Sequence, residues 1–435
     1  MGFKRYELKI GKRVESIELP EEHVVQVIDG GSAPKITDVR QAALDALRNP
    51  VGTQALNNLV QKGDKVAIIV SDITRTWSRT KDYLPAVVEE LNNNGIPDAD
   101  IFVIIATGTH RDNNDEEKRL ILGDNLFARL QIFDHDAYNS EANVFLGTTS
   151  RGTPVYIDKR AVEADKVILT GGITTHLFAG FGGGRKSVMP GIAGVETIKH
   201  NHLLALTDEV GGGVNQETYL TKIEGNRVNE DMCEVCAFLN PCFLINSIMD
   251  AEGDFVRIVA GHWYEAWYEG TQEVMKLQGV EAKAKADVVI GSSGGCPMDI
   301  NLYQGMKSYA PAQMAMQPNG IFIALLDCPD IYEPPSFFEC FRFNDELSME
   351  KELRAGFTIP FYIAFYMYCM SKQFTVIMVT RPENFEAVRK TGQIPAATLA
   401  EAWQLAQDKL QAQGKDKTYT VNIMPHGVNT VPMFK

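Results

Sequence analysis

Three polar clusters that follow apolar runs contain the side chains best suited to chemistry. They are Asp72 with Arg75, His110 with Arg111, and His176. Histidine titrates near neutrality, so an imidazole can act as a general acid or a general base. Arginine presents a planar fork of donors that can bind both oxygens of a carboxylate at once. Together these residue types can hold a small organic anion and move protons beside it.

The densest concentration of unusual residues is the stretch 170–203, TGGITTHLFAGFGGGRKSVMPGIAGVETIKHNHL. The glycines at 180–184 disfavour a helix or a strand, because glycine costs backbone entropy in both. We interpret this stretch as a loop that lets the backbone approach a cofactor and leaves room for a bulky group on Lys186. A helix over 195–202 is expected next.

The same loop partly matches a phosphate-binding loop. Gly180, Lys186 and Ser187 fit the pattern G-x-x-x-x-G-K-[ST]. Arg185, however, stands where the second glycine is required, and no clear acidic strand end for magnesium follows. The mismatch disfavours hydrolysis of a nucleoside triphosphate, while a nucleotide-binding role for residues 180–187 stays open.

Apolar runs precede the polar clusters and predict the strands that position them. The runs are Lys65–Val70, Ile101–Ala106 and Lys166–Leu169. Continuous β-branched runs separated by helices indicate parallel strands that are covered on both faces. Ligands of open parallel sheets bind outside the carboxyl ends of the strands. The clusters are therefore expected at the edge of the sheet where active sites form.

The strand–helix pattern restarts in the last third of the chain. A helical segment over 261–279 precedes three further apolar strands, at 287–291, 321–326 and 375–379. We therefore predict an α/β protein with two α/β domains, mainly parallel sheets and an interdomain active-site cleft. The expected ranges are 1–275 for the N-terminal domain and 276–435 for the C-terminal domain.

Composition and charge restrict the class of partner. The chain has 435 residues, 45% of them hydrophobic, and a formal net charge of −14. This balance is typical of a globular protein and argues against a nucleic-acid partner, which needs a basic surface. The start of the chain lacks the apolar core of a signal peptide. The apolar run 357–370 is interrupted by Pro360 and is too short to span a membrane, so we expect a buried helix and no membrane partner. The oligomeric state is not indicated.

Seven cysteines are scattered along the chain. An odd number without a paired framework indicates reduced thiols and a cytoplasmic protein. Cys233 and Cys236 have C-x-x-C spacing, but no second pair completes a zinc site and no thioredoxin-like unit surrounds them. We interpret both as structural residues.

Taken in order, the motifs resemble those of the nickel-dependent lactate racemase family. The resemblance extends from about residue 66 to residue 310 and rests on Asp72-x-x-Arg75, Gly108-Thr109-His110, His176, Gly-Gly-Arg185-Lys186, Asn201-His202 and Gln304-x-x-Lys307. Members use a nickel pincer nucleotide, pyridinium-3,5-bisthiocarboxylic acid mononucleotide, whose two sulfur atoms and ring carbon bind nickel. The resemblance implies an isomerase, namely a racemase or epimerase of a small, lactate-like 2-hydroxy acid.

The resemblance also implies a role for each matched residue. Lys186 is similar to the lysine that bonds covalently to the cofactor, and His202 to the remaining nickel ligand. His110 and His176 resemble the paired acid/base histidines. Four residues resemble those that hold the substrate, and the second domain contributes the last two: Asp72, Arg75, Gln304 and Lys307.

Two histidines, an arginine and an electrophilic cofactor suit the chemistry of a 2-hydroxy acid. The hydrogen on its α-carbon is hardly acidic, because the adjacent carboxylate cannot stabilise a second negative charge well. Removal of that hydrogen as hydride, while a histidine takes the hydroxyl proton, avoids the dianion and gives a 2-oxo acid. No side chain can receive hydride, so a cofactor must. Return of hydride to the opposite face gives the mirror product.

Two other functions were weighed against this one. A non-catalytic or cofactor-processing nucleotide-binding protein would use the glycine-rich loop for phosphate. A nicotinamide dehydrogenase is disfavoured, because no G-x-G-x-x-G opens a βαβ unit where it is expected. The particular 2-hydroxy acid is also open: Thr76 stands where the family pattern often has proline, and Trp77 is expected to line the pocket.

Overall fold

The computed structural model describes residues 2–434 and divides into two compact units. The larger unit comprises Ser32–Ala205 and Gln216–Leu277, and the smaller unit comprises Met1–Gly31, Leu206–Asn215 and Gln278–Lys435. Each unit contains a six-stranded sheet of mainly parallel strands, which confirms the predicted fold class. The predicted ranges 1–275 and 276–435 follow the chain without interruption, whereas the smaller unit also takes in the two earlier segments.

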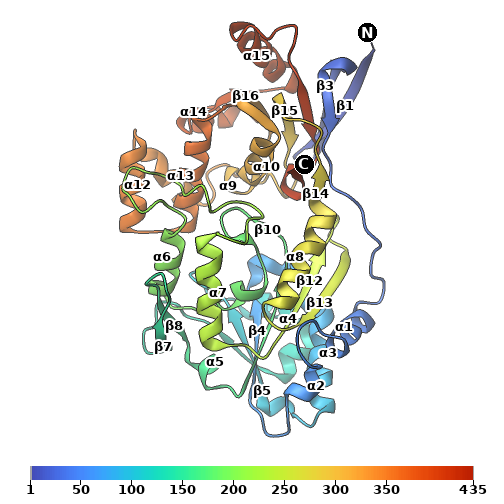
Figure 1. Cartoon of the computed structure of the whole chain (residues 1–435), viewed down its shortest axis with the longest axis vertical. Helices are drawn as coiled ribbons and strands as arrows, with labels where there is room; N and C mark the ends of the chain where they lie inside the picture. Colours follow the sequence, from blue (N-terminus) through green and yellow to red (C-terminus); the bar gives the residue numbers. More distant parts are fainter. Residues whose placement is uncertain (1, 435) are drawn as a thin grey trace. The chain divides into compact units, whose positions relative to one another are not determined.

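The sheet of the larger unit has the strand order β13-β12-β9-β4-β5-β6 (Figure 1). Its strands are β4 (Val66–Ser71), β5 (Ile101–Ala106), β6 (Gln131–Asp134), β9 (Lys166–Gly172), β12 (Phe243–Met249) and β13 (Phe255–Gly261). All neighbours are parallel except β12 and β13. Because β4 lies between β5 and β9, the three predicted apolar runs are adjacent and their carboxyl ends meet at one edge.

The larger unit has eight α-helices among the described residues. They are α1 (Val39–Arg48), α2 (Leu56–Leu59), α3 (Thr80–Asn93), α4 (Asp115–Arg129), α5 (Lys159–Glu163), α6 (Val195–Leu203), α7 (Arg227–Leu239) and α8 (Glu265–Gln278). Leu44 of α1 and Val87 of α3 share a core with Ile68 of β4, whose sequence VAIIVS is buried almost throughout. The helix predicted over 195–202 is confirmed as α6.

Short elements at the carboxyl edge carry three of the predicted site residues, Arg75, His176 and Lys186. They are η2 (Ile73–Ser78) after β4, and β10 (Thr175–His176), β11 (Gly180–Phe181) and η4 (Gly184–Ser187) after β9. Strands β10 and β11 pair antiparallel, so the chain folds back on itself between β9 and η4. A separate antiparallel hairpin, β7 (Asn143–Thr148) and β8 (Pro154–Asp158), precedes α5.

The sheet of the smaller unit is parallel throughout, in the order β18-β17-β16-β15-β19-β3. Its strands are β3 (Val24–Val27), β15 (Ala286–Ser292), β16 (Met316–Leu325), β17 (Thr375–Val379), β18 (Ile394–Ala396) and β19 (Val421–Met424). Two further pairs belong to this unit: β1 (Phe3–Ile10) with β2 (Arg13–Pro20), and β14 (Gly279–Glu281) with β20 (Val431–Met433). Leu8 and Leu19 of the hairpin share a core with Ile290 of β15, which explains why the start of the chain belongs here.

The smaller unit also has seven α-helices among the described residues. They are α9 (Leu302–Gly305), α10 (Tyr309–Met314), α11 (Pro335–Phe338), α12 (Glu346–Ala355), α13 (Ile359–Ser371), α14 (Phe385–Lys390) and α15 (Leu399–Ala412). Helix α13 confirms the buried helix predicted at 357–370. Within residues 2–434, every helix is too short or too polar to cross a membrane.

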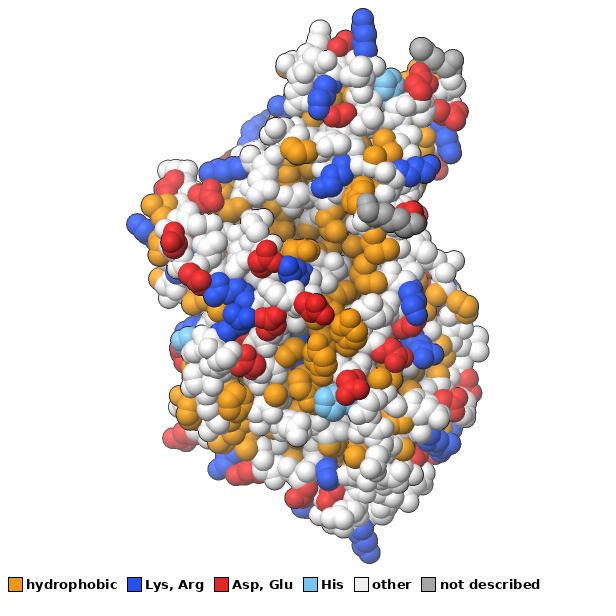
Figure 2. All heavy atoms as spheres, in the orientation of Figure 1, with side chains coloured by type: hydrophobic (Ala, Val, Ile, Leu, Met, Phe, Trp, Pro, Cys, Tyr) orange, Lys and Arg blue, Asp and Glu red, His pale blue; other side chains and the backbone are white. Residues whose placement is uncertain are grey.

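Charges of both signs lie on the molecular surface, and the cysteines form no disulfide among the described residues. On the face drawn in Figure 2, lysine and arginine side chains are interspersed with aspartate and glutamate and do not form a continuous basic surface. All seven cysteines are free thiols, and Cys233 and Cys236 lie on α7.

Candidate active site

Asp72 and His110 form a pair at the carboxyl ends of the neighbouring strands β4 and β5. The Asp72 side chain is buried, whereas the ring of His110 is 43% exposed. His110 Nδ1 lies 2.6 Å from Asp72 Oδ2, and Thr74 Oγ1 donates to Asp72 Oδ1 at 2.6 Å. Burial would raise the pKa of Asp72, but the hydrogen bonds from His110 and Thr74 hold it below its ordinary value. Asp72 is therefore an ionised carboxylate that orients the His110 ring.

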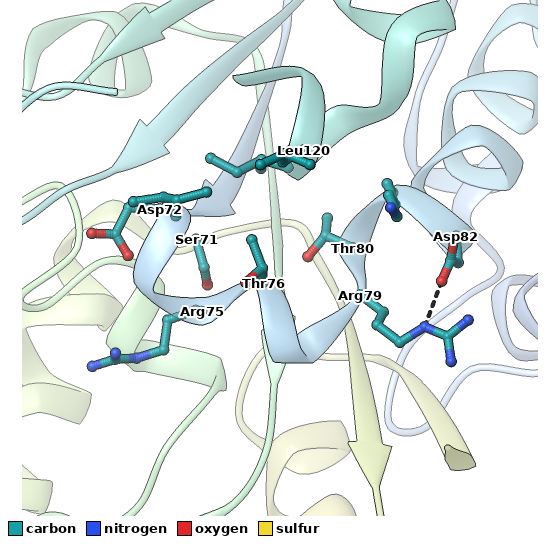
Figure 3. Close-up of a pocket in the computed structure, with 11 residues that line it drawn as sticks. Ser71, Asp72, Arg75, Thr76, Arg79, Thr80, Asp82 and Leu120 are labelled. Atoms are coloured by element: carbon teal, nitrogen blue, oxygen red, sulfur yellow. Dashed lines mark hydrogen bonds and ion pairs between the residues drawn. The ribbon is translucent and has the colours of Figure 1, made fainter. Parts of the chain in front are cut away.

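Arg75 lies on η2, where its backbone N donates to the carbonyl oxygen of Asp72 at 3.0 Å. Figure 3 shows the side chains of Asp72 and Arg75 extending to the same side of the η2 turn. Arg79 turns the other way and pairs with Asp82 at 2.7 Å. A pocket of about 480 Å³ runs along η2 and is bounded by Leu120 of α4. Arg75 is exposed at this edge, where a guanidinium can bind a carboxylate.

His176 is the last residue of β10 and has electrostatic surroundings unlike those of His110. Ala179 N donates to His176 Nδ1 at 3.2 Å, so the neutral ring carries its hydrogen on Nε2. Burial and the positive charges of nearby side chains, Lys186 and Arg75 foremost, place the pKa of His176 well below its ordinary value. The ring is a neutral imidazole at physiological pH.

Lys186 and His202 lie against the same aromatic ring, that of Phe178. Lys186 Nζ is 6.0 Å from the centroid of that ring, and the His202 ring centroid is 5.4 Å from it. His202 Nδ1 lies 2.9 Å from the carbonyl oxygen of Ile198, so the neutral imidazole donates there and keeps its lone pair on Nε2. His200 is exposed on the same helix, as the angle between residues two apart predicts.

Burial dominates the electrostatics of Lys186 and His202. It lowers the pKa of Lys186 well below its ordinary value, and the charges of Arg185 and Arg75 add to the effect. Burial and the Lys186 charge lower the pKa of His202 to about 3. An amine with a strongly lowered pKa is a nucleophile, and a neutral imidazole is a metal ligand. The two side chains can therefore hold a covalently attached group and a metal ion.

Arg185 is a residue to which the sequence analysis gave no role of its own. Its side chain is fully buried, donates to the carbonyl oxygen of Ala179 at 2.9 Å, and lies 4.0 Å from the centroid of the Trp267 ring. Burial lowers the pKa of Arg185 to about 10, while the thiols of Cys233 and Cys236 lie close enough to oppose that shift. In the sequence, the signal that could have pointed to Arg185 is an arginine at the position where a phosphate-binding loop requires glycine.

The glycine-rich loop does not leave space around its backbone at three of its glycines, contrary to expectation. A Cβ on Gly184, whose φ is +55°, would meet the Trp267 ring at 2.6 Å. A Cβ on Gly183 would lie 2.8 Å from Ile173, and one on Gly180 would lie 2.1 Å from a backbone oxygen. These glycines therefore let the loop pack tightly against its own unit and fix the backbone before Lys186.

Gln304 and Lys307 lie in the smaller unit, on the consecutive turns α9 and η5 (Met306–Ser308). Asn301 caps α9 by accepting from Gln304 N at 2.9 Å. Lys307 Nζ donates to Gln304 Oε1 at 2.5 Å, which confirms that the two side chains share a face. The pair places an ammonium group and an amide side by side.

The larger unit brings together six of the predicted site residues through shared neighbours. Arg75 acts electrostatically on Asp72, His176 and Lys186, and Phe178 joins Lys186 to His202. A parallel sheet with two imidazoles, a guanidinium and a buried amine at its carboxyl edge defines an α/β enzyme site for a small anion.

Comparison with known proteins identifies the family. Family models for the lactate racemase N-terminal domain and the lactate racemase C-terminal domain match residues 10–212 and 281–431. The lactate racemase of Thermoanaerobacterium thermosaccharolyticum is 32% identical over 432 residues, 98% of each chain. That of Lactiplantibacillus plantarum is 31% identical over 294 residues, 67% of each chain. The chain belongs to the lactate racemase family and is an isomerase.

Solved structures agree with this assignment. The lactate racemase apoprotein from Thermoanaerobacterium thermosaccharolyticum matches with a TM-score of 0.87 and 30% identity, over 99% of this chain and 100% of that chain. A Thermotoga maritima protein matches with a TM-score of 0.63 and 16% identity, over 93% of this chain and 100% of that chain. The second similarity shows the fold alone.

Proposed function

We propose that this chain racemises or epimerises lactate or a closely related small 2-hydroxy acid, with a nickel pincer nucleotide as its cofactor. The observation that carries the proposal is the placement of Lys186 and His202 against Phe178, with His176 under the influence of the Lys186 charge. The named activity of the relatives makes lactate the first substrate to test.

The chemistry of the residues around Phe178 fits such a cofactor. Lys186 offers a weakly basic amine that can bond to an acyl carbon of the nucleotide. His202 offers Nε2 as the ligand that joins the soft sulfur and carbon donors around nickel. When bound, the cofactor supplies the electrophilic centre that accepts the substrate's α-hydrogen as hydride.

The remaining residues of the site have roles in binding and proton transfer. Arg75 binds the substrate carboxylate, and the anionic Asp72 holds the His110 ring with its Nε2 directed away from the carboxylate. His110 takes the hydroxyl proton of one enantiomer, His176 takes that of the other, and each returns it to the 2-oxo acid in the reverse direction.

The smaller unit completes the site in this proposal. Gln304 and Lys307 present donors to the oxygen that changes between hydroxyl and carbonyl, where positive charge stabilises the developing alkoxide.

The first test measures the nickel content and the covalent adduct of the protein, and not its activity. Protein made in cells that synthesise the cofactor is expected to carry nickel and a nucleotide-sized adduct, both measured on the intact chain. Lys186→Ala should lose the adduct, whereas Lys199→Ala, an exposed lysine of α6, should keep it. Unmodified, nickel-free wild-type protein from such cells would contradict the proposal.

The activity is tested by chiral analysis of a panel of 2-hydroxy acids with the loaded enzyme. Interconversion of lactate or of a near homologue is the expected result. An adduct on Lys186 without interconversion of any acid in the panel would instead support a cofactor-processing protein.

A further inference from the structure

His135, which follows β6, is a buried histidine outside the proposed reaction. Its side chain is 1% exposed. Its backbone N donates to the carbonyl oxygen of Ile105 at 3.1 Å, and its carbonyl oxygen accepts from Thr107 Oγ1 at 2.5 Å. The backbone of His135 is thus fixed to the end of β5, directly before the turn that carries His110.

Both ring nitrogens of His135 face hydrogen-bond acceptors. Nδ1 lies 2.9 Å from Asp158 Oδ2, and Nε2 lies 3.0 Å from the carbonyl oxygen of Ala193. Neither acceptor has a hydrogen to give, since a carbonyl oxygen only accepts and Asp158 is ionised. Burial would raise the pKa of Asp158, but donation from Arg160 and His135 holds it below its ordinary value. Each ring nitrogen therefore lies opposite an oxygen to which an N–H of the ring can donate.

The charged groups around this ring are balanced. Arg160 binds Asp158 at 2.6 Å and also donates to the carbonyl oxygen of Asp134 at 3.0 Å. The Asp134 carboxylate pairs with Lys118 at 2.6 Å. Segment 188–194 and strand β5 contribute no ionisable side chain. The ring thus has one direct anionic partner, Asp158, which it shares with Arg160.

The acceptor of the second hydrogen bond, Ala193, belongs to the segment that joins Lys186 to helix α6. Asp158 N donates to the carbonyl oxygen of Ile192 at 3.0 Å, and Gly108 N donates to that of Gly191 at 2.9 Å. A Cβ on Gly191 would lie 2.8 Å from Ala106, so this segment rests directly on the end of β5. Gly194, next along, is the N-cap of α6, the helix that carries His202.

We propose that His135 is a positioning residue, whose two-ended hydrogen bond from Asp158 to Ala193 sets the spacing between the His110 turn, Lys186 and helix α6. The roles of those three elements rest on the proposed function. His135 contacts neither substrate nor cofactor in this proposal and acts through the backbone of residues 188–194.

Two substitutions at His135 each keep one of its two ring hydrogen bonds and remove the other. The amide nitrogen of asparagine takes the place of Nδ1, so His135→Asn keeps the hydrogen bond to Asp158 and loses the one to the carbonyl oxygen of Ala193. The amide nitrogen of glutamine takes the place of Nε2, so His135→Gln keeps Ala193. We expect kcat to fall about 10- to 100-fold in His135→Asn, with KM within about threefold and the Lys186 adduct retained, because small displacements of catalytic groups cost this much. His135→Gln should recover most of the rate.

His23→Asn is the matched control. His23 also bonds through Nδ1 to a backbone carbonyl, that of Tyr419 at 2.7 Å, but it lies in the smaller unit. The kcat of His23→Asn should stay within about twofold of wild type, because no element of the proposed site is attached to His23. Equal losses in the asparagine and glutamine variants of His135 would overturn the role assigned to the Ala193 bond.

Amide hydrogen exchange tests the inference without any measurement of activity. In His135→Asn, amides in 107–110 and 186–194 should exchange about tenfold faster, while those of β12 stay unchanged. Unchanged exchange, or a uniform rise over the larger unit, would overturn the inference. An inactive, adduct-free wild type would contradict the proposed function alone, since these measurements still decide on His135.

Discussion

The two imidazoles of the proposed reaction, His110 and His176, have opposite surroundings. His110 is half exposed and lies 2.6 Å from the ionised carboxylate of Asp72. Burial, together with the positive charges of Lys186 and Arg75, keeps the pKa of His176 well below its ordinary value. The two rings therefore face neighbours of opposite charge, although the proposed reaction asks the same proton transfer of both.

This difference indicates that the charges around the two rings become similar only when substrate and cofactor are bound. A reversible racemase needs both rings to give and take protons. A substrate carboxylate on Arg75 would cancel part of the positive charge near His176, and an amide bond at Lys186 would remove its charge altogether. Each event raises the proton affinity of His176 towards that of an ordinary histidine. The comparison therefore predicts that the charges of this cluster, and not only its shape, control the rate.

The largest expected effect comes from removal of either ring. His110→Ala and His176→Ala should each reduce interconversion at least about 10³-fold, because one proton acceptor is lost for each direction. The rate is measured by chiral analysis of lactate with enzyme of equal nickel content. His200→Ala, which removes an exposed histidine of α6, should keep full activity. Full activity in either of the first two variants would break the two-base scheme.

Removal of the charge beside His110 should have the next largest effect. Asp72→Asn keeps the shape of the side chain but replaces an anionic acceptor with a neutral one, and kcat should fall about 10- to 100-fold. Asp82→Asn is a matched control in the same pocket, since Asp82 pairs with Arg79 and not with a site histidine. Equal kcat values in the two variants would show that the His110 pair has no electrostatic role.

Much of the fold and part of the site could be predicted from the sequence for physical reasons. The runs that became β4, β5 and β9 are continuous and apolar, so strand type and carboxyl-end placement followed from burial on both faces. The proximity of Asp72 and His110 followed from their positions directly after two such strands. These features depend on local sequence.

The features that escaped prediction depend on contacts between distant residues. The segment 206–215 belongs to the smaller unit because buried Glu350 accepts hydrogen bonds from Gly211 N and Gly213 N, a pairing with no local signal. His135 lies in a polar stretch and received no role, because its partners Asp158 and Ala193 become neighbours only after folding. The glycines before Lys186 were expected to make space, but the side chains that fill it come from distant residues.

The buried His202 and the exposed His200 should also differ in how they affect the pH dependence of the free energy of unfolding. The pKa of His202 is lowered to about 3 in the folded chain, so the unfolded chain binds a proton more readily below about pH 6.5. Stability from this group is present above that pH and is lost as the pH falls towards 3. Between pH 7 and pH 5 the loss is about 2 kcal/mol for one such histidine. Urea unfolding of cofactor-free protein should show a smaller loss in His202→Gln and an unchanged loss in His200→Gln.

The smallest expected effect concerns the substrate side chain and Trp77, which lies on η2 two residues beyond Arg75. Its indole is 40% exposed, and a Cβ on Gly172, the last residue of β9, would lie 2.8 Å from its ring. The indole therefore lies against the strand that leads to His176, where it can limit the size of a group beyond the carboxylate clamp. Trp77→Ala should raise kcat/KM for a bulky 2-hydroxy acid relative to lactate by about 3- to 10-fold, because a pocket discriminates only modestly by size. Exposed Tyr138 on the same unit offers a matched control, and Tyr138→Ala should leave the ratio unchanged. An unchanged ratio in Trp77→Ala would assign substrate selection to residues other than those of η2. The rate would then depend on the charged cluster, and the specificity on a pocket elsewhere.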